Sequence, residues 1–197
     1  MASAPATAQE GVTARPINRS VIVDAPVAEV WKTWTTSEGV PTFMGLGAEI
    51  DLRPRGAFRV MFNRTGKSSL ERGNDGQILA FEPMEMLSIT WMTPMFMPEL
   101  SGESTSIVLR FMPLCEGSKT RVDLVNSGYG SGPKWREAYA YNSKGWVTVL
   151  SRLAYRFKYG PINWDTFELE RKHRMPLVDH PIDRNNETIA ETSEKYC

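Results

Sequence analysis

The chain has 197 residues, 41% of them hydrophobic, and Lys+Arg and Asp+Glu both total 23, so the formal net charge is zero. This length and composition can bury a full core, and the length favours one domain with appendages over two domains. The balanced charge provides no basic field, which disfavours nucleic acid and anionic lipid as partners. No apolar run approaches the ~18 to 20 residues of a membrane span, so none is predicted.

Residues 1–15 combine many small residues with no periodicity, which predicts a disordered or loosely attached tail. This tail lacks a basic segment followed by an apolar one. We therefore expect a cytoplasmic protein, with the mature form of an exported protein as the alternative. Cys115 and Cys197 are far apart in the sequence and have no metal-ligand spacing. They are expected to be free thiols, with neither a disulfide framework nor a zinc site.

One strand and two short helical segments are predicted next. β-Branched residues over 17–24 indicate the strand. An apolar stripe over 27–34 indicates a helix, and Pro26 is tolerated at its start. A second short helical or looped segment covers 42–46. The large apolar side chains of these two segments are Trp31, Trp34, Phe43 and Met44.

From there to residue 126 the hydrophobic period changes to two, which predicts an antiparallel meander. The predicted strands are residues 48–52, 57–64, 76–82, 86–92, 105–112 and 121–126. Apolar residues alternate with polar ones within them, so one face of the sheet is strongly apolar. Arg59, Arg110 and Asp123 fall on the opposite face, where we expect them to be solvated.

The loop over 93–102 is too long and too rich in proline for a hairpin turn. It nevertheless carries the apolar residues Met95, Phe96 and Met97. Exposed apolar residues in a loop usually fold back on a core or guard the mouth of a pocket. We therefore expect this loop to lie beside a ligand site.

Residues 135–159 have an unbroken helical period and predict an amphipathic helix of about seven turns. Two residues on its apolar side do not suit a plain core helix. Asn142 is either a satisfied buried amide or part of a cavity lining. Gly145 costs about 1 kcal/mol relative to alanine in a helix. We expect a strand or the first helix to pack closely against it, so that Gly145→Leu destabilises the fold.

The predicted organisation is a tail over 1–15, a domain over 16–160 and a C-terminal extension over 161–197. In the extension, Trp164, Phe167 and Leu169 are expected to pack on the body, and apolar density then falls. One strand, two short helices, a meander and a long final helix together make an α+β helix-grip layout. In that layout a curved antiparallel sheet of six to seven strands wraps around the long C-terminal helix.

The detailed residues resemble the SRPBCC (START-like) superfamily. The most similar branch is that of the bacterial single-domain homologues of the heat-shock-protein-90 ATPase activator. The resemblance spans about residues 17 to 157. It rests on Ala25-Pro26 with Val30-Trp31, the Arg-Pro-x-Gly-x-Phe turn ending at Phe58, Glu82-Pro83 with Leu87, and Gly145-Trp146 with Leu150.

This resemblance implies an amphipathic cavity between the last helix and the sheet, which the superfamily uses for apolar ligands. The many aromatic side chains are difficult to pack without gaps, and methionines adapt to irregular apolar ligands. We therefore expect a small apolar or amphipathic molecule as the partner. The candidate ligand-binding residues are Trp34, Phe43, Met44, Phe58, Phe62, Trp91, Met95, Phe96, Trp135, Tyr139, Asn142 and Trp146.

Signals for catalysis are weak. The sequence contains no HExxH, Gly-x-Ser-x-Gly, Walker or dinucleotide motif, and both histidines, His173 and His180, lie in the extension. No catalytic residue, metal or cofactor is predicted. One alternative is a polyketide-cyclase-like enzyme, for which Tyr139 and Asn142 are the candidate groups on the helix. The other alternative is a co-chaperone that acts through its surface, as the eukaryotic namesake does.

Overall fold

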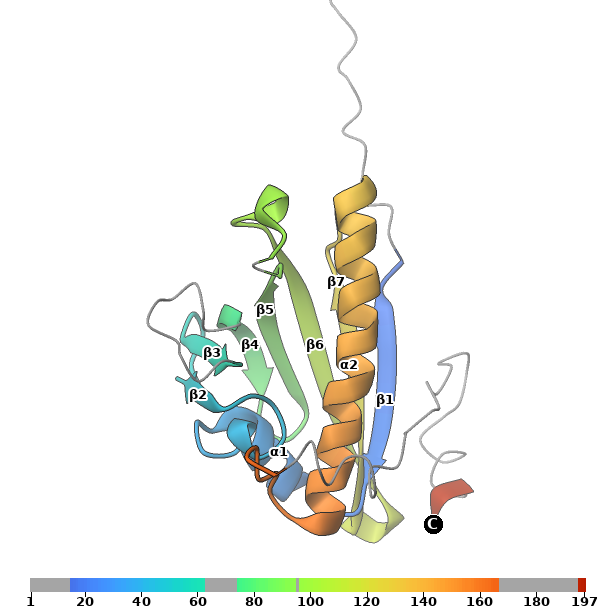
Figure 1. The fold of residues 1–197 in the computed structure, drawn as a ribbon. Helices are drawn as coiled ribbons and strands as arrows, with labels where there is room; N and C mark the ends of the chain where they lie inside the picture. Colours follow the sequence, from blue (N-terminus) through green and yellow to red (C-terminus); the bar gives the residue numbers. More distant parts are fainter. Residues whose placement is uncertain (1–14, 63–73, 95, 167–194) are drawn as a thin grey trace, which may run out of the picture.

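The computed structural model describes residues 15–62, 74–94, 96–166 and 195–197. It confirms the α+β helix-grip fold, with a single antiparallel sheet in the order β1-β7-β6-β5-β4-β3-β2 (Figure 1). The strands are β1 (Ile17–Val23), β2 (Gly47–Ile50), β3 (Ala57–Met61), β4 (Asn74–Glu82), β5 (Met86–Met92), β6 (Ser104–Leu114) and β7 (Lys119–Ser127). The helices are α1 (Val27–Thr35) and α2 (Pro133–Tyr159). Short 3-10 turns follow α1 (η1, Val40–Thr42) and connect β5 to β6 (η3, Pro98–Leu100) and β6 to β7 (η4, Cys115–Gly117).

Helix α2 lies along one face of the sheet and contacts β1, while α1 packs against β6 and β7 (Figure 1). The helix starts at Pro133, in the first turn where proline is tolerated. It ends at Gly160, whose φ of 99° favours glycine and whose N–H donates to the Arg156 carbonyl at 2.9 Å. The predicted long helix is therefore confirmed, and Pro133 is its first residue, as proline after glycine indicates in the sequence.

The core lies between α2 and the sheet. Strand β5 shows the predicted alternation, because Leu87, Ile89 and Trp91 are buried while the residues between them are partly exposed. Trp34 from α1 packs edge to face on Phe43, with ring centroids 4.8 Å apart. These contacts place α1 and the η1 segment at one end of the sheet, where they extend the same apolar cluster.

Strand β7 departs from the predicted alternation because it is buried over most of its length. Asp123 was expected to be solvated, and that prediction is wrong. Its carboxylate is buried, lies 2.9 Å from the Arg121 guanidinium, and accepts a hydrogen bond from the Ser20 hydroxyl. A buried carboxylate needs such partners, because an unpaired charge is costly to desolvate.

The start of the extension packs on the body of the fold. The Trp164 indole N–H donates to the Pro41 carbonyl at 2.7 Å, and the Ile162 N–H donates to the Thr42 carbonyl at 2.9 Å. The packing predicted for Trp164 is thus confirmed, whereas Phe167 and Leu169 lie outside the described residues. The division into tail, domain and extension stays a prediction.

The expectation of free thiols is wrong, because Cys115 and Cys197 form a disulfide across a sequence separation of 82 residues. Cys115 begins the turn between β6 and β7, and the Tyr196 carbonyl next to Cys197 accepts a 2.9 Å hydrogen bond from Lys119. Sequence spacing could not reveal this pair, because only the fold brings the chain end to that turn.

In the described part of the chain, no helix is long and apolar enough to cross a bilayer.

Candidate functional site

Two tryptophans meet at the centre of the space between α2 and the sheet. Trp146 on α2 and Trp91 on β5 have ring centroids 4.8 Å apart, and both are buried. Four further candidates, Trp34, Phe43, Met44 and Phe58, are fully buried in the same apolar cluster. The structure therefore brings these six predicted residues together as one continuous core.

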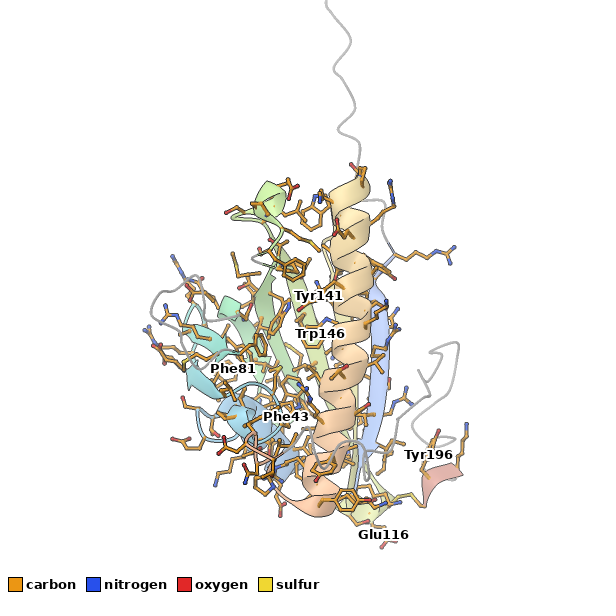
Figure 2. The ribbon with its side chains drawn as sticks, in the orientation of Figure 1. Phe43, Phe81, Glu116, Tyr141, Trp146 and Tyr196 are labelled. Carbon is orange, nitrogen blue, oxygen red and sulfur yellow. A yellow bond between two sulfur atoms is a disulfide. The ribbon has the colours of Figure 1, made fainter. Side chains whose placement is uncertain are left out.

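Beside this core lies a group of exposed rings, which we call the aromatic rim and define as Phe62, Phe96 and Tyr141. Their exposed fractions are 41%, 62% and 52%. Phe62 lies 6.5 Å from Trp91 between centroids, and Phe96 lies edge to face on Tyr141 at 5.0 Å. Figure 2 labels Tyr141 and Trp146 beside α2, where Trp146 is buried against Trp91 and Tyr141 is exposed. Phe62 and Phe96 were predicted from the sequence, Tyr141 was missed, and Met95 lies outside the described residues.

Gly145 lies one helical turn after Tyr141, and residues four apart in a helix share one side. A Cβ built on Gly145 meets no atom within 4 Å. The expectation of a strand or helix packed closely against Gly145 is therefore wrong. Helix α2 instead has a bare backbone facing open space next to the aromatic rim.

A buried polar network underlies the Trp91–Trp146 pair, with Asn126 at its centre. The Asn126 side-chain oxygen accepts hydrogen bonds from the Trp146 indole N–H at 3.0 Å and from the Tyr129 hydroxyl. The Asn126 amide donates to the Thr105 hydroxyl at 2.8 Å and to the Ser106 carbonyl at 3.0 Å. Sequence reasoning missed this network, whose donors and acceptors come from separate elements.

Asn142 joins the network at its edge, where its amide donates to the Tyr129 hydroxyl at 2.9 Å. Of the two alternatives for Asn142, the structure supports the satisfied buried amide. Burial raises the pKa of the Tyr129 hydroxyl well above its usual range, because the phenolate is poorly solvated there. This hydroxyl is neutral at physiological pH and serves as a hydrogen-bonding group. The only signal for Tyr129 in the sequence was its position between two glycines, Gly128 and Gly130.

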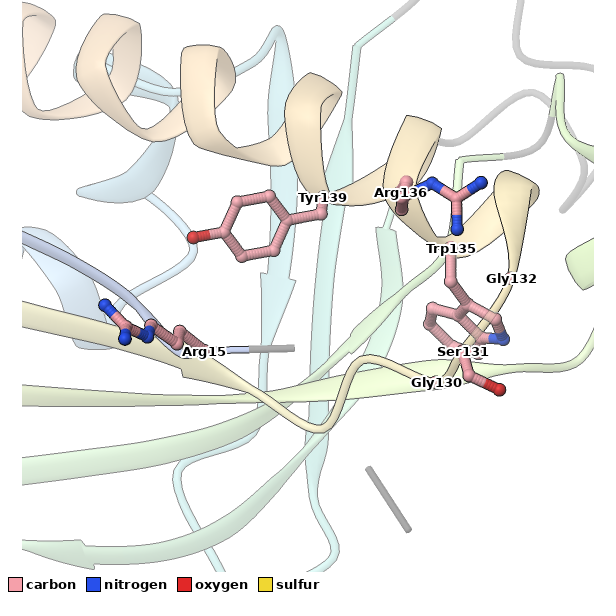
Figure 3. Close-up of a pocket in the computed structure, with 7 residues that line it drawn as sticks. All are labelled: Arg15, Gly130, Ser131, Gly132, Trp135, Arg136 and Tyr139. Carbon is pink, nitrogen blue, oxygen red and sulfur yellow. The ribbon is translucent and has the colours of Figure 1, made fainter. Parts of the chain in front are cut away.

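A separate open pocket of about 440 Å³ lies at the N-terminal end of α2. Its lining residues are Arg15, Gly130, Ser131, Gly132, Trp135, Arg136 and Tyr139 (Figure 3). Trp135 and Tyr139 were among the predicted ligand residues, whereas both arginines were missed. Arg15 carried no signal because it precedes the first strand, and Arg136 falls on the polar side of the helical pattern.

A curved antiparallel sheet that holds one long C-terminal helix, with aromatic side chains between them, defines the helix-grip class of proteins. Within that class the chain belongs to the family described as "Activator of Hsp90 ATPase homolog 1-like protein", whose model matches residues 24–158. This confirms the family resemblance read from the sequence. No curated protein matches the chain.

Solved structures of the same fold have low sequence identity to this chain. Protein MLL2253 from Mesorhizobium loti is 18% identical with a TM-score of 0.59, and the match covers 75% of this chain and 100% of that one. The Aha1 dimer from Colwellia psychrerythraea is 15% identical with a TM-score of 0.58, covering 75% and 98%. An HSP90 activator from Plasmodium falciparum is 14% identical with a TM-score of 0.52, covering 69% and 88%. These likenesses support the fold alone.

Proposed function

We propose that this protein binds a small, flat apolar molecule at the aromatic rim, over the Trp91–Trp146 pair between α2 and the sheet. The observation that carries the proposal is the exposure of Phe62, whose ring lies 6.5 Å from that of Trp91, together with the exposed Phe96–Tyr141 pair. Clustered apolar side chains at a protein surface usually mark a binding site. Aromatic rings also favour flat ligands, through offset stacking and edge-to-face contacts.

The surroundings of the rim support an apolar ligand. Gly145 leaves open space on the same side of α2 as Tyr141, because a Cβ built on it meets no atom within 4 Å. The Trp146 N–H is already engaged by Asn126. The site therefore offers ring faces and edges for recognition, which suits the small apolar or amphipathic ligand expected from the family resemblance.

Titration of the full chain with the neutral dye Nile red tests the proposal. We expect saturable binding of about one dye per chain, displaced by fatty acids or flat aromatic compounds. Phe96→Ala and Tyr141→Ala should each weaken binding about five- to tenfold, because each removes one aromatic contact. Met84→Ala is the matched control, since Met84 is exposed in the turn between β4 and β5. Absence of saturable binding, or equal loss in the control, would exclude this function.

A protein partner is the second candidate function. Membership of the family described as "Activator of Hsp90 ATPase homolog 1-like protein" favours it, and strongly exposed rings such as Phe96 and Tyr141 are typical of protein contacts. The test is stimulation of the ATPase of a purified heat-shock-protein-90 chaperone by the wild-type chain and by Tyr141→Ala. Stimulation lost in the variant supports this candidate, and no stimulation by the wild type refutes it.

The disulfide is evidence about the cellular compartment in which the protein functions. Disulfides persist in oxidising compartments and are rare in the cytosol, so the Cys115–Cys197 bond supports the exported alternative over a cytoplasmic location. Thiol labelling of the protein in freshly lysed native cells tests this. Two reactive thiols per unfolded chain would support the cytoplasmic location instead.

A further inference from the structure

We infer that the pocket at the start of α2 is a second ligand site, and that its ligand is a flat aromatic anion such as an aromatic carboxylate. The pocket combines two aromatic side chains, Trp135 and Tyr139, with two guanidinium groups, Arg15 and Arg136 (Figure 3). Its volume of about 440 Å³ falls in the ~300–1,000 Å³ range of small-molecule sites.

The two aromatic walls of the pocket are held in place. Trp135 and Tyr139 are one helical turn apart, and both pack edge to face on the buried Tyr129, at centroid distances of 6.2 and 5.1 Å. A Cβ on Gly130 would come within 2.5 Å of the Trp135 indole nitrogen. Because Gly130 has no side chain, the Trp135 ring can lie directly on the loop backbone. The apolar walls therefore exist before any ligand binds.

The charge in the pocket has one sign. No carboxylate lines it, and neither Arg15 nor Arg136 forms an ion pair with any acidic side chain in the described segments. Glu137, the first acidic residue of α2, is paired with Lys134 at 3.2 Å, and Lys134 also lies 3.3 Å from Glu99. The two guanidinium groups are thus available to an incoming anion.

The chemistry of these groups selects the class of ligand. A guanidinium group binds a carboxylate through two parallel hydrogen bonds, and it also stacks on flat rings. The first turn of α2 contains no acidic residue, so the positive end of the helix dipole adds to the same potential. A molecule with a flat ring for Trp135 and Tyr139 and an anionic group for the arginines matches both features.

This site is distinct from the aromatic rim. Arg136 and Tyr141 are five residues apart on α2, so they point ~140° apart around the helix axis. Trp135 and Tyr139 on the pocket side contact Tyr129, whereas Tyr141 contacts Phe96. The inference about this pocket can therefore be tested independently of apolar binding at the rim.

Isothermal titration of the full chain with 2-naphthoate and with its neutral analogue 2-naphthamide tests the inference. With the aromatic rim saturated by Nile red throughout, we expect one naphthoate per chain, with naphthamide at least about tenfold weaker. Arg15→Gln and Arg136→Gln should each weaken naphthoate binding about three- to tenfold, and the double variant more, because each removes charge-assisted hydrogen bonds. Added salt should weaken naphthoate binding and leave naphthamide binding unchanged.

The control is Arg110→Gln, which removes an exposed guanidinium on β6 and should leave naphthoate affinity unchanged. Gly130→Ala provides a second variant, because the added methyl group must displace Trp135 and should also weaken binding. Equal affinity for the anion and the amide would overturn the inference. Absence of naphthoate binding, or full naphthoate affinity in the double arginine variant, would also overturn the inference. Neither result would decide whether Nile red binds at the rim.

Discussion

Asn126→Leu is expected to be among the most destabilising substitutions in this protein. Asn126 is fully buried and links Trp146, Tyr129, Thr105 and Ser106 through its side chain. Leucine has the same number of side-chain heavy atoms in a similar branched shape but is bulkier, so the change leaves no cavity and removes the polar partner. The loss of stability then comes from desolvated groups that have no hydrogen bond.

The magnitude follows from the number of stranded donors. The Trp146 N–H and the Tyr129 O–H both lose their acceptor, and each unsatisfied buried donor costs about 1–3 kcal/mol. The expected loss is therefore about 2–6 kcal/mol in the free energy of unfolding. That is a large share of the ~5–15 kcal/mol typical of a domain.

Urea unfolding followed by tryptophan fluorescence measures this loss, and Asn142→Leu is the matched control. Asn142 makes one hydrogen bond in the network, to Tyr129, which can still donate to Asn126 after the change. We expect a loss of about 1 kcal/mol for Asn142→Leu. The reasoning is refuted if Asn126→Leu loses no more stability than Asn142→Leu.

Three further predictions concern other parts of the molecule. Gly145→Ala should raise the free energy of unfolding by about 0.5–1 kcal/mol in urea melts, because the added Cβ meets open space and alanine favours helix. A lower free energy of unfolding would instead support the close packing at Gly145 that was expected from the sequence. Burial raises the pKa of Tyr129 in the folded state, so its stabilising contribution is full below pH ~10 and is lost as the pH rises further. The wild type should therefore lose stability more steeply above pH 10 than Tyr129→Phe, by up to ~1.4 kcal/mol per pH unit, and parallel curves would contradict this. Cys197→Ser should lower the free energy of unfolding by up to about 4.5 kcal/mol from loop-closure entropy over 82 residues, and dithiothreitol should lower the wild type to the same value without affecting the variant.

The sequence by itself determined the elements of this fold. A period of two over the meander and a period of 3.6 over α2 are local properties of the chain, because side-chain direction follows from backbone geometry. The end of α2 was equally readable, since Gly160-Pro161 follows the periodic run directly and glycine is the residue that tolerates the positive φ found there. These signals, with the order of the elements, were sufficient for the helix-grip fold.

Only the tertiary structure decided which aromatic residues are exposed and which polar groups pair. Phe58 and Phe62 have the same parity in the predicted strand over 57–64, yet Phe58 is buried and Phe62, which lies just past the end of β3, is exposed. The sequence could not distinguish them, because exposure depends on what other elements cover a position. The same physical reason applies to the Cys115–Cys197 bond and to the pocket that joins Arg15 to Arg136. Each is a contact between residues distant in sequence, and no local pattern encodes it.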